Sequence, residues 1–134
     1  MQLLINIDVD DLDRAVEFYR SGLGLHPGRR LFGGSVVEMS GAASRIFLLA
    51  KASGSLASPT AGSVRIYHRH WTPVHLDFEV DEITAAVQRA LAAGAELEGE
   101  IQSMRWGRLA TLSDPFGHGF CLIQFSGKSY DEIA

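Results

Sequence analysis

The sequence PVHLDFEV, residues 73–80, alternates an ionisable side chain with an apolar one through three periods. Because successive side chains of a β-strand point to opposite faces, His75, Asp77 and Glu79 are expected to line one face. The apolar residues between them are expected to pack against the rest of the protein on the other face. This alternation is typical of a strand that is buried on one side only.

The same alternation occurs 71 residues earlier, in INIDV at residues 5–9. An acidic segment follows each copy at once, DDLD at residues 10–13 and DEIT at residues 81–84. Such segments favour the start of a helix, where short side chains cap free amides and negative charge suits the helix dipole. Apolar residues then recur at helical spacing in both copies. The chain therefore contains an internal repeat.

Short β-prone segments separated by glycine follow each predicted helix, at 28–31, 35–39 and 45–50 in the first copy and at 97–104, 108–113 and 120–125 in the second. The predicted fold is a single α+β domain made of two tandem β-α-β-β-β modules. Its expected parts are module one at 1–51, a linker at 52–71, module two at 72–126 and a C-terminal tail at 127–134. Residues 52–65 are rich in Ser, Gly, Ala and Thr, which predicts a mobile segment.

Composition limits the partners of the protein. The formal net charge is −4, and the 12 Lys and Arg residues are scattered, so nucleic acid is not an expected partner. Apolar runs such as residues 46–50 are far shorter than the roughly 20 residues that span a bilayer. No membrane partner is expected, and the absence of a signal-peptide pattern predicts a cytoplasmic protein.

Cys121 is the only cysteine, which excludes an internal disulfide and a multi-thiolate metal site.

Two segments carry a resemblance to a known family. VDDLDRAVEFY at residues 9–19 opens the first module, and DPFGHGFCLIQF at residues 114–125 ends the second. Together with the tandem modules, they resemble the vicinal oxygen chelate superfamily, which includes glyoxalases, bleomycin-resistance proteins and extradiol dioxygenases. The resemblance implies curved mixed sheets around a cleft, helices outside, a small-molecule ligand and a homodimer.

In metal-binding members of this superfamily, each of four strands commonly supplies one ligand. The matching positions here are Leu4, Phe47, His75 and Cys121. Leu4 and Phe47 carry no ligand atom, so no cofactor is expected, although a divalent metal remains an alternative in which His75 would be the ligand. His68 and His70 offer a different zinc site together with His75 and Asp77, but the turn-like sequence between His70 and His75 does not require their rings to converge.

The resemblance also assigns the polar row to the cleft, where two interpretations compete. In the first, Asp77 or Glu79 has a raised pKa and abstracts a proton next to a carbonyl, with His75 as its partner. In the second, which is favoured, the row is a solvated polar wall, because such alternation is also the mark of any one-faced strand. Residues two apart on a strand lie about 7 Å from each other, so the three residues of the row are poorly placed to share one ion. The other expected ligand-binding residues are Asn6, Asp8, Phe47, Trp106, Arg108 and Cys121.

The leading functional hypothesis is a glyoxalase/bleomycin-resistance-like protein that binds a small, partly apolar organic ligand without the usual divalent metal. The alternative is a metal-dependent lyase, isomerase or dioxygenase of the same superfamily that uses His75. The sequence leaves open whether the protein is an enzyme.

Overall fold

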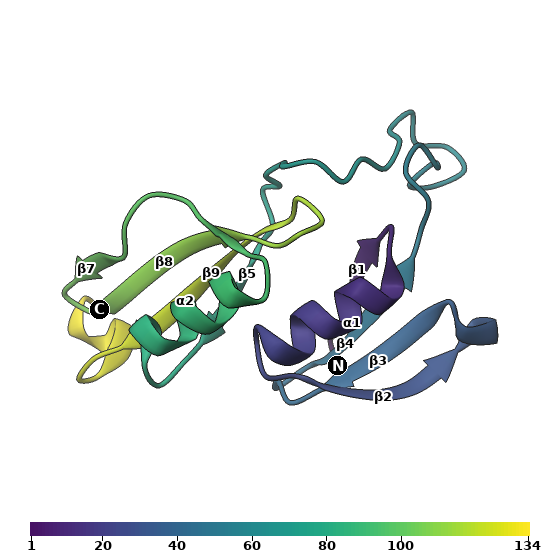
Figure 1. Ribbon diagram of the computed structural model, residues 1–134. Coiled ribbons are helices and arrows are strands. Elements are labelled where there is room, and N and C mark those ends of the chain that lie inside the picture. The colour runs from purple at the N-terminus through teal and green to yellow at the C-terminus, as the bar shows by residue number, and fades with distance from the viewer. The chain divides into compact units, whose positions relative to one another are not determined.

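The chain folds as two units, each of which begins with a strand, continues with a helix and ends with further strands (Figure 1). The computed structural model describes all residues, 1–134, and divides them into unit 1, Met1–His68, and unit 2, Arg69–Ala134. Each unit contains one α-helix and one mixed β-sheet. The α+β class predicted from the sequence is therefore confirmed.

Unit 1 contains β1 (Leu4–Val9), α1 (Leu12–Ser21), β2 (His26–Leu31), a 3₁₀ turn η1 (Phe32–Gly34), β3 (Val36–Ser40) and β4 (Arg45–Ala50). Its sheet has the order β1-β4-β3-β2, with β1 parallel to β4 and the other neighbours antiparallel. The helix α1 begins after Asp11, whose carboxylate accepts a hydrogen bond from the Arg14 amide at 3.1 Å. This is the N-terminal cap that the acidic segment predicts.

One face of the unit 1 sheet is apolar and carries α1. Ile46 and Leu48 of β4 are almost fully buried, as are Ala15 and Phe18 of the helix. The opposite face is more polar because the alternation of β1 directs its Asn and Asp side chains there. The core of this unit therefore lies between the helix and one side of the sheet.

Unit 2 contains β5 (Leu76–Glu79), α2 (Ile83–Ala92), β6 (Glu96–Leu97), β7 (Gln102–Met104), β8 (Gly107–Ser113), β9 (Gly119–Phe125) and a 3₁₀ turn η2 (Ser129–Glu132). Its main strand order is β5-β9-β8-β6, and β7 also pairs with β8. The prediction of a single strand at 97–104 is wrong, since β6 and β7 are separate strands. Gly99 lies between them with φ of +79°, a conformation that interrupts an extended strand.

The start of α2 differs from the start of α1. Glu82 occupies the N-terminal cap position but makes no side-chain capping bond. Instead, the Ile83 amide donates to Oε1 of Gln124 on β9 at 2.8 Å. The side chains of Ile83 and Val87 are almost fully buried, as is Leu122 of β9. A side chain from the sheet therefore accepts the hydrogen bond of the first helical amide, whereas the acidic residues at the helix start do not.

The segment expected to be a mobile linker makes specific contacts within unit 1. The Arg65 guanidinium donates to Asp8 of β1 at 2.6 Å and to Ser55 at 3.3 Å, and it also donates to the Leu56 carbonyl. Leu56 and Val64 form an isolated β-bridge. These bonds attach residues 55–65 to β1, and the mobility of the segment stays a prediction.

None of the helices is both long enough and apolar enough to cross a bilayer.

Replacing Gly107 with alanine is expected to destabilise the fold. Gly107 has φ of +153°, and a Cβ atom there would lie 2.2 Å from the backbone carbonyl oxygen of Gln124. We expect Gly107→Ala to lower the free energy of unfolding by about 1–3 kcal/mol, measured by urea denaturation. Gly62→Ala is the control, because no atom lies within 4 Å of the added Cβ. Equal stability of the two variants would contradict this account.

Candidate functional site

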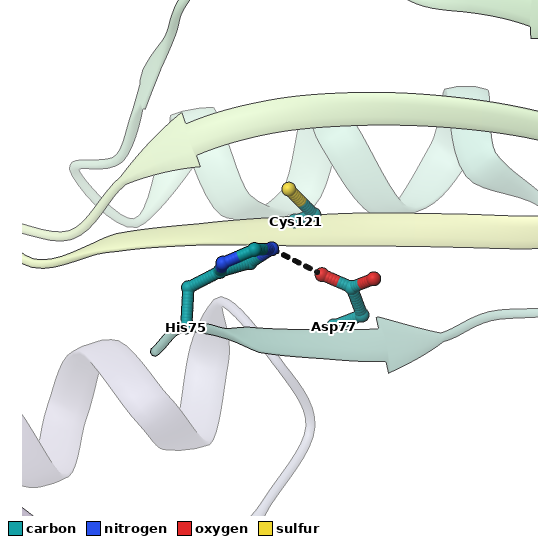
Figure 2. A group of neighbouring side chains, drawn as sticks. All are labelled: His75, Asp77 and Cys121. Atoms are coloured by element: carbon teal, nitrogen blue, oxygen red, sulfur yellow. Dashed lines mark ion pairs between the residues drawn. The ribbon is translucent and has the colours of Figure 1, made fainter. Parts of the chain in front are cut away.

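Three side chains with metal-binding or proton-transfer chemistry meet on one face of the unit 2 sheet (Figure 2). His75 directly precedes β5, Asp77 lies within it, and Cys121 lies on the neighbouring strand β9. Asp77 and Cys121 are register partners of the parallel β5–β9 pair, which places them on the same face. The ligand atoms of the three residues all lie within 4.8 Å of one another. We refer to these residues as the His75 group.

The side chains of His75 and Asp77 converge, although they lie two residues apart on the chain. Nε2 of His75 is 3.3 Å from Oδ1 of Asp77, as the dashed line in Figure 2 shows. His75 and Asp77 therefore approach more closely than their spacing along the strand suggests, because the imidazole is directed along the strand toward the carboxylate. Glu79, the third member of the polar row, is exposed and pairs in register with Ile123. It is not part of the group.

The members of the His75 group differ in their exposure and electrostatics. The side chains of His75 and Asp77 are 36% and 38% exposed, whereas Cys121 is only 4% exposed. Burial raises the pKa of the Cys121 thiol, a hydrogen bond with the Thr111 hydroxyl lowers it, and the Asp77 carboxylate raises it further. The net shift is upward, so the thiol is protonated at neutral pH and is not an activated nucleophile.

Trp71 contributes an aromatic surface beside this group. Its ring lies 4.8 Å from the imidazole of His75, centroid to centroid, at an angle of 38°. The indole occupies the space above Gly119, where a Cβ atom would lie 2.1 Å from Cε3 of the ring. The Arg69 guanidinium lies 5.3 Å from the ring centroid and forms an ion pair with Glu98 at 2.6 Å. Trp71 is thus held in place although it is 47% exposed.

The alternation of β5 does not identify Trp71 as a site residue, because Trp71 lies outside the strand. The sequence feature that accounts for the position of Trp71 is distant along the chain, because it is the glycine 48 positions later that leaves room for the ring. The Thr111 hydroxyl, 3.7 Å from the Cys121 sulfur, is a second residue that the sequence pattern misses. Thr111 is the register partner of Cys121 in the β8–β9 pair.

The expected ligand-binding residues of unit 1 share the face opposite α1. Asn6 pairs in register with Phe47, and Asp8 pairs with Leu49. The carboxylate of Asp8 accepts a hydrogen bond from Arg65 at 2.6 Å and forms an ion pair with it. Its negative charge is therefore balanced within unit 1 by Arg65.

Trp106 and Arg108 have other contacts. Trp106 lies in the turn between β7 and β8, where its ring packs against Phe125 at 6.1 Å and Tyr130 at 5.3 Å. Arg108 pairs in register with Gln124, and its guanidinium lies 3.5 Å from the Thr84 hydroxyl of α2. Arg108 is therefore on the helix-covered face of the sheet, opposite to the face that carries Cys121. The structure does not bring it together with the His75 group.

The donor atoms of the His75 group decide which metal ions fit it. One nitrogen, one carboxylate oxygen and one sulfur form a set that suits zinc and similar ions. An ion that prefers an octahedron of oxygens, such as Mg²⁺, does not fit this set. Binding through Cys121 would first require loss of the thiol proton, which the raised pKa opposes. His68 and His70 are not in the group, so the alternative zinc site with three histidines does not form.

Comparison with known sequences gives a family and one relative that matches most of this chain. Residues 4–123 match the family described as "Glyoxalase-like domain". The anthracycline biosynthesis protein DauV from Streptomyces sp. (strain C5) is 31% identical over 123 residues, which cover 90% of this chain and 40% of that protein. The chain spans less than half the length of the curated relatives it matches.

Solved structures with the same fold include resistance and antibiotic-binding proteins. The fosfomycin resistance protein FosX from Listeria monocytogenes superposes with a TM-score of 0.72 at 20% identity, covering 99% of this chain and 95% of that chain. TnmS3, an antibiotic binding protein from Streptomyces sp. CB03234, superposes with a TM-score of 0.65 at 23% identity, covering 94% and 96%. At these identities the likeness shows the fold alone. The sequence match over residues 4–123 agrees with the fold of the two units, and the chain belongs to the glyoxalase-like domain family of the vicinal oxygen chelate superfamily.

Proposed function

We propose that this protein binds a small, partly apolar organic ligand against the His75 group and Trp71, without a divalent metal at that place. The observation that carries this proposal is the buried Cys121, a protonated thiol at the position that the resemblance aligns with a metal ligand. A neutral thiol makes this part of the sheet less polar and a weaker metal site.

The side chains at the site favour an aromatic ligand that carries a hydroxyl or carbonyl group. The half-exposed indole of Trp71 offers a surface for stacking. Beside it, His75 and Asp77 supply a donor and an acceptor that solvent can reach. The relatives DauV and TnmS3, whose names refer to an anthracycline and an antibiotic, are consistent with this class of ligand. A cytoplasmic homodimer belongs to the same proposal.

Binding of an anthracycline provides a direct test. We expect calorimetric titration to show saturable binding that EDTA does not change, with the ligand recovered unaltered by chromatography. Trp71→Ala should weaken the affinity at least about tenfold, or about 1.4 kcal/mol, because the stacking surface is lost. Trp106→Phe is the control, since Trp106 packs against Phe125 and Tyr130. Equal affinity of wild type and Trp71→Ala, or abolition of binding by EDTA, would contradict the proposal.

A second candidate function is a metal-dependent lyase, isomerase or dioxygenase. The observation that favours it is the close approach of the three ligand atoms in the His75 group. His75, Asp77 and Cys121 would hold the ion, which when bound supplies Lewis-acid polarisation of a substrate oxygen. Glu79, on the same strand and outside the group, would then be the carboxylate that remains able to accept a proton.

Metal analysis separates the two candidate functions. Protein purified without a histidine tag and dialysed against a mild chelator is expected to hold far less than one equivalent of metal at the His75 group. Elemental analysis of wild type and His75→Ala measures this directly. Nearly one equivalent in the wild type that disappears in His75→Ala would favour the enzyme.

The protonation of Cys121 gives a pH-dependent prediction. Because its pKa in the folded protein is raised, iodoacetamide should alkylate the native thiol slowly at pH 8 and faster as the pH rises further. The raised pKa stabilises the fold below the thiol's ordinary pKa, and this contribution is lost as the pH rises through the folded-state value. Urea midpoints measured across this range should fall in the wild type more than in Cys121→Ala. Rapid alkylation of folded protein at pH 7 would show that the thiol is activated instead.

A further inference from the structure

Two histidine side chains that lie outside the His75 group contact each other near the start of β9. Nδ1 of His118 lies 3.0 Å from Nε2 of His70. The two rings meet nearly at right angles, at 83°, with centroids 4.9 Å apart. We refer to His70 and His118 as the histidine pair. The two residues also form an isolated parallel β-bridge, so their backbones are paired as well as their side chains.

The backbone on both sides of the histidine pair is fixed by hydrogen bonds. The amide of His70 donates to the Gly117 carbonyl at 2.9 Å. On the other segment, the buried carboxylate of Asp114 accepts from the amides of Phe116 at 2.8 Å and His118 at 2.9 Å. Because the two Cα positions are held in this way, little chain entropy would be lost when both imidazoles engage a common ligand.

We propose that the histidine pair binds a divalent transition-metal ion, with zinc as the representative ion. Two imidazole nitrogens bound to one tetrahedral zinc at about 2.0–2.1 Å are separated by about 3.3 Å, and the 3.0 Å separation here is close to that value. Imidazole is a ligand that suits zinc, copper and nickel. The ion would occupy the position between the rings, and water would complete its coordination.

The change in protonation on metal binding is small. In the neutral pair, one ring donates its N–H proton to the lone pair of the other ring. For both rings to coordinate the ion through these nitrogens, the donating ring must carry its remaining proton on its other nitrogen. No proton needs to be released from a neutral pair.

The position of the histidine pair suggests a structural role for this ion. Trp71 follows His70 directly, and its indole lies against Gly119, which follows His118. An ion held by both histidines would therefore link the two segments that position the Trp71 ring. This metal site is separate from the His75 group, and its occupancy can be measured whether or not the proposed organic ligand is correct.

Calorimetric titration of ZnCl₂ into metal-free, untagged protein tests the inference. We expect a binding site that is kept in His75→Ala and in His68→Ala, the latter being a control two residues from the pair. His70→Ala and His118→Ala should each weaken zinc binding at least about tenfold, or about 1.4 kcal/mol. The double variant should lose little more than either single variant, because the two rings act as one chelating unit.

Circular dichroism of each variant establishes that it is folded. If an alanine variant unfolds, His118→Asn decides the question, because its amide keeps hydrogen-bonding capacity but removes the imidazole ligand. Loss of zinc binding in folded His118→Asn supports the site. Unchanged zinc affinity in the folded histidine-pair variants overturns it, and so does a site that disappears in His75→Ala and persists in His70→Ala.

Discussion

The parallel pairing of β5 with β9 is the constraint on which the candidate site depends. Its register places Asp77 beside Cys121 on one face, and Phe78 beside Leu122 on the face covered by α2. Because side chains alternate with a period of two, a slip of one residue would exchange the two faces of β5. The buried side chains under α2 thus specify which polar groups meet on the opposite face. Packing on one side of the sheet determines the chemistry on the other.

Local sequence patterns predict which side chains share a face of a strand. They predict the contacts between these side chains, and the turns between strands, less well. The alternation of residues 75–79 is sufficient to place His75 and Asp77 on one face, since it reflects burial of the other side. The approach of the His75 imidazole to the Asp77 carboxylate depends on a side-chain rotamer, which alternation does not determine. Likewise, Gly99 divides the strand expected at 97–104 because its backbone conformation is set by the turn, and composition alone does not show this.

The two units show how one repeated sequence pattern is satisfied by different interactions. Acidic residues precede both helices, but only Asp11 caps its helix with its own side chain. In unit 2, Gln124 reaches the first helical amide from a strand 41 residues away in sequence. Similarly, His70 and Trp71 find their partners on the β9 side of a turn that begins at Asp114. Contacts of this range require the tertiary fold, and no window of the sequence contains them.

The close contact between the Trp71 ring and the Gly119 backbone links the residue types at two distant positions. Any side chain larger than hydrogen at 119 would occupy the volume that the Trp71 ring now fills. A relative with a larger residue at 119 would therefore be expected to carry a smaller one at 71, or to direct its aromatic ring elsewhere. The two positions should co-vary in evolution, because a residue exchanged at one position alone leaves either a steric overlap or a void. Ligand preference should change together with this pair of residues.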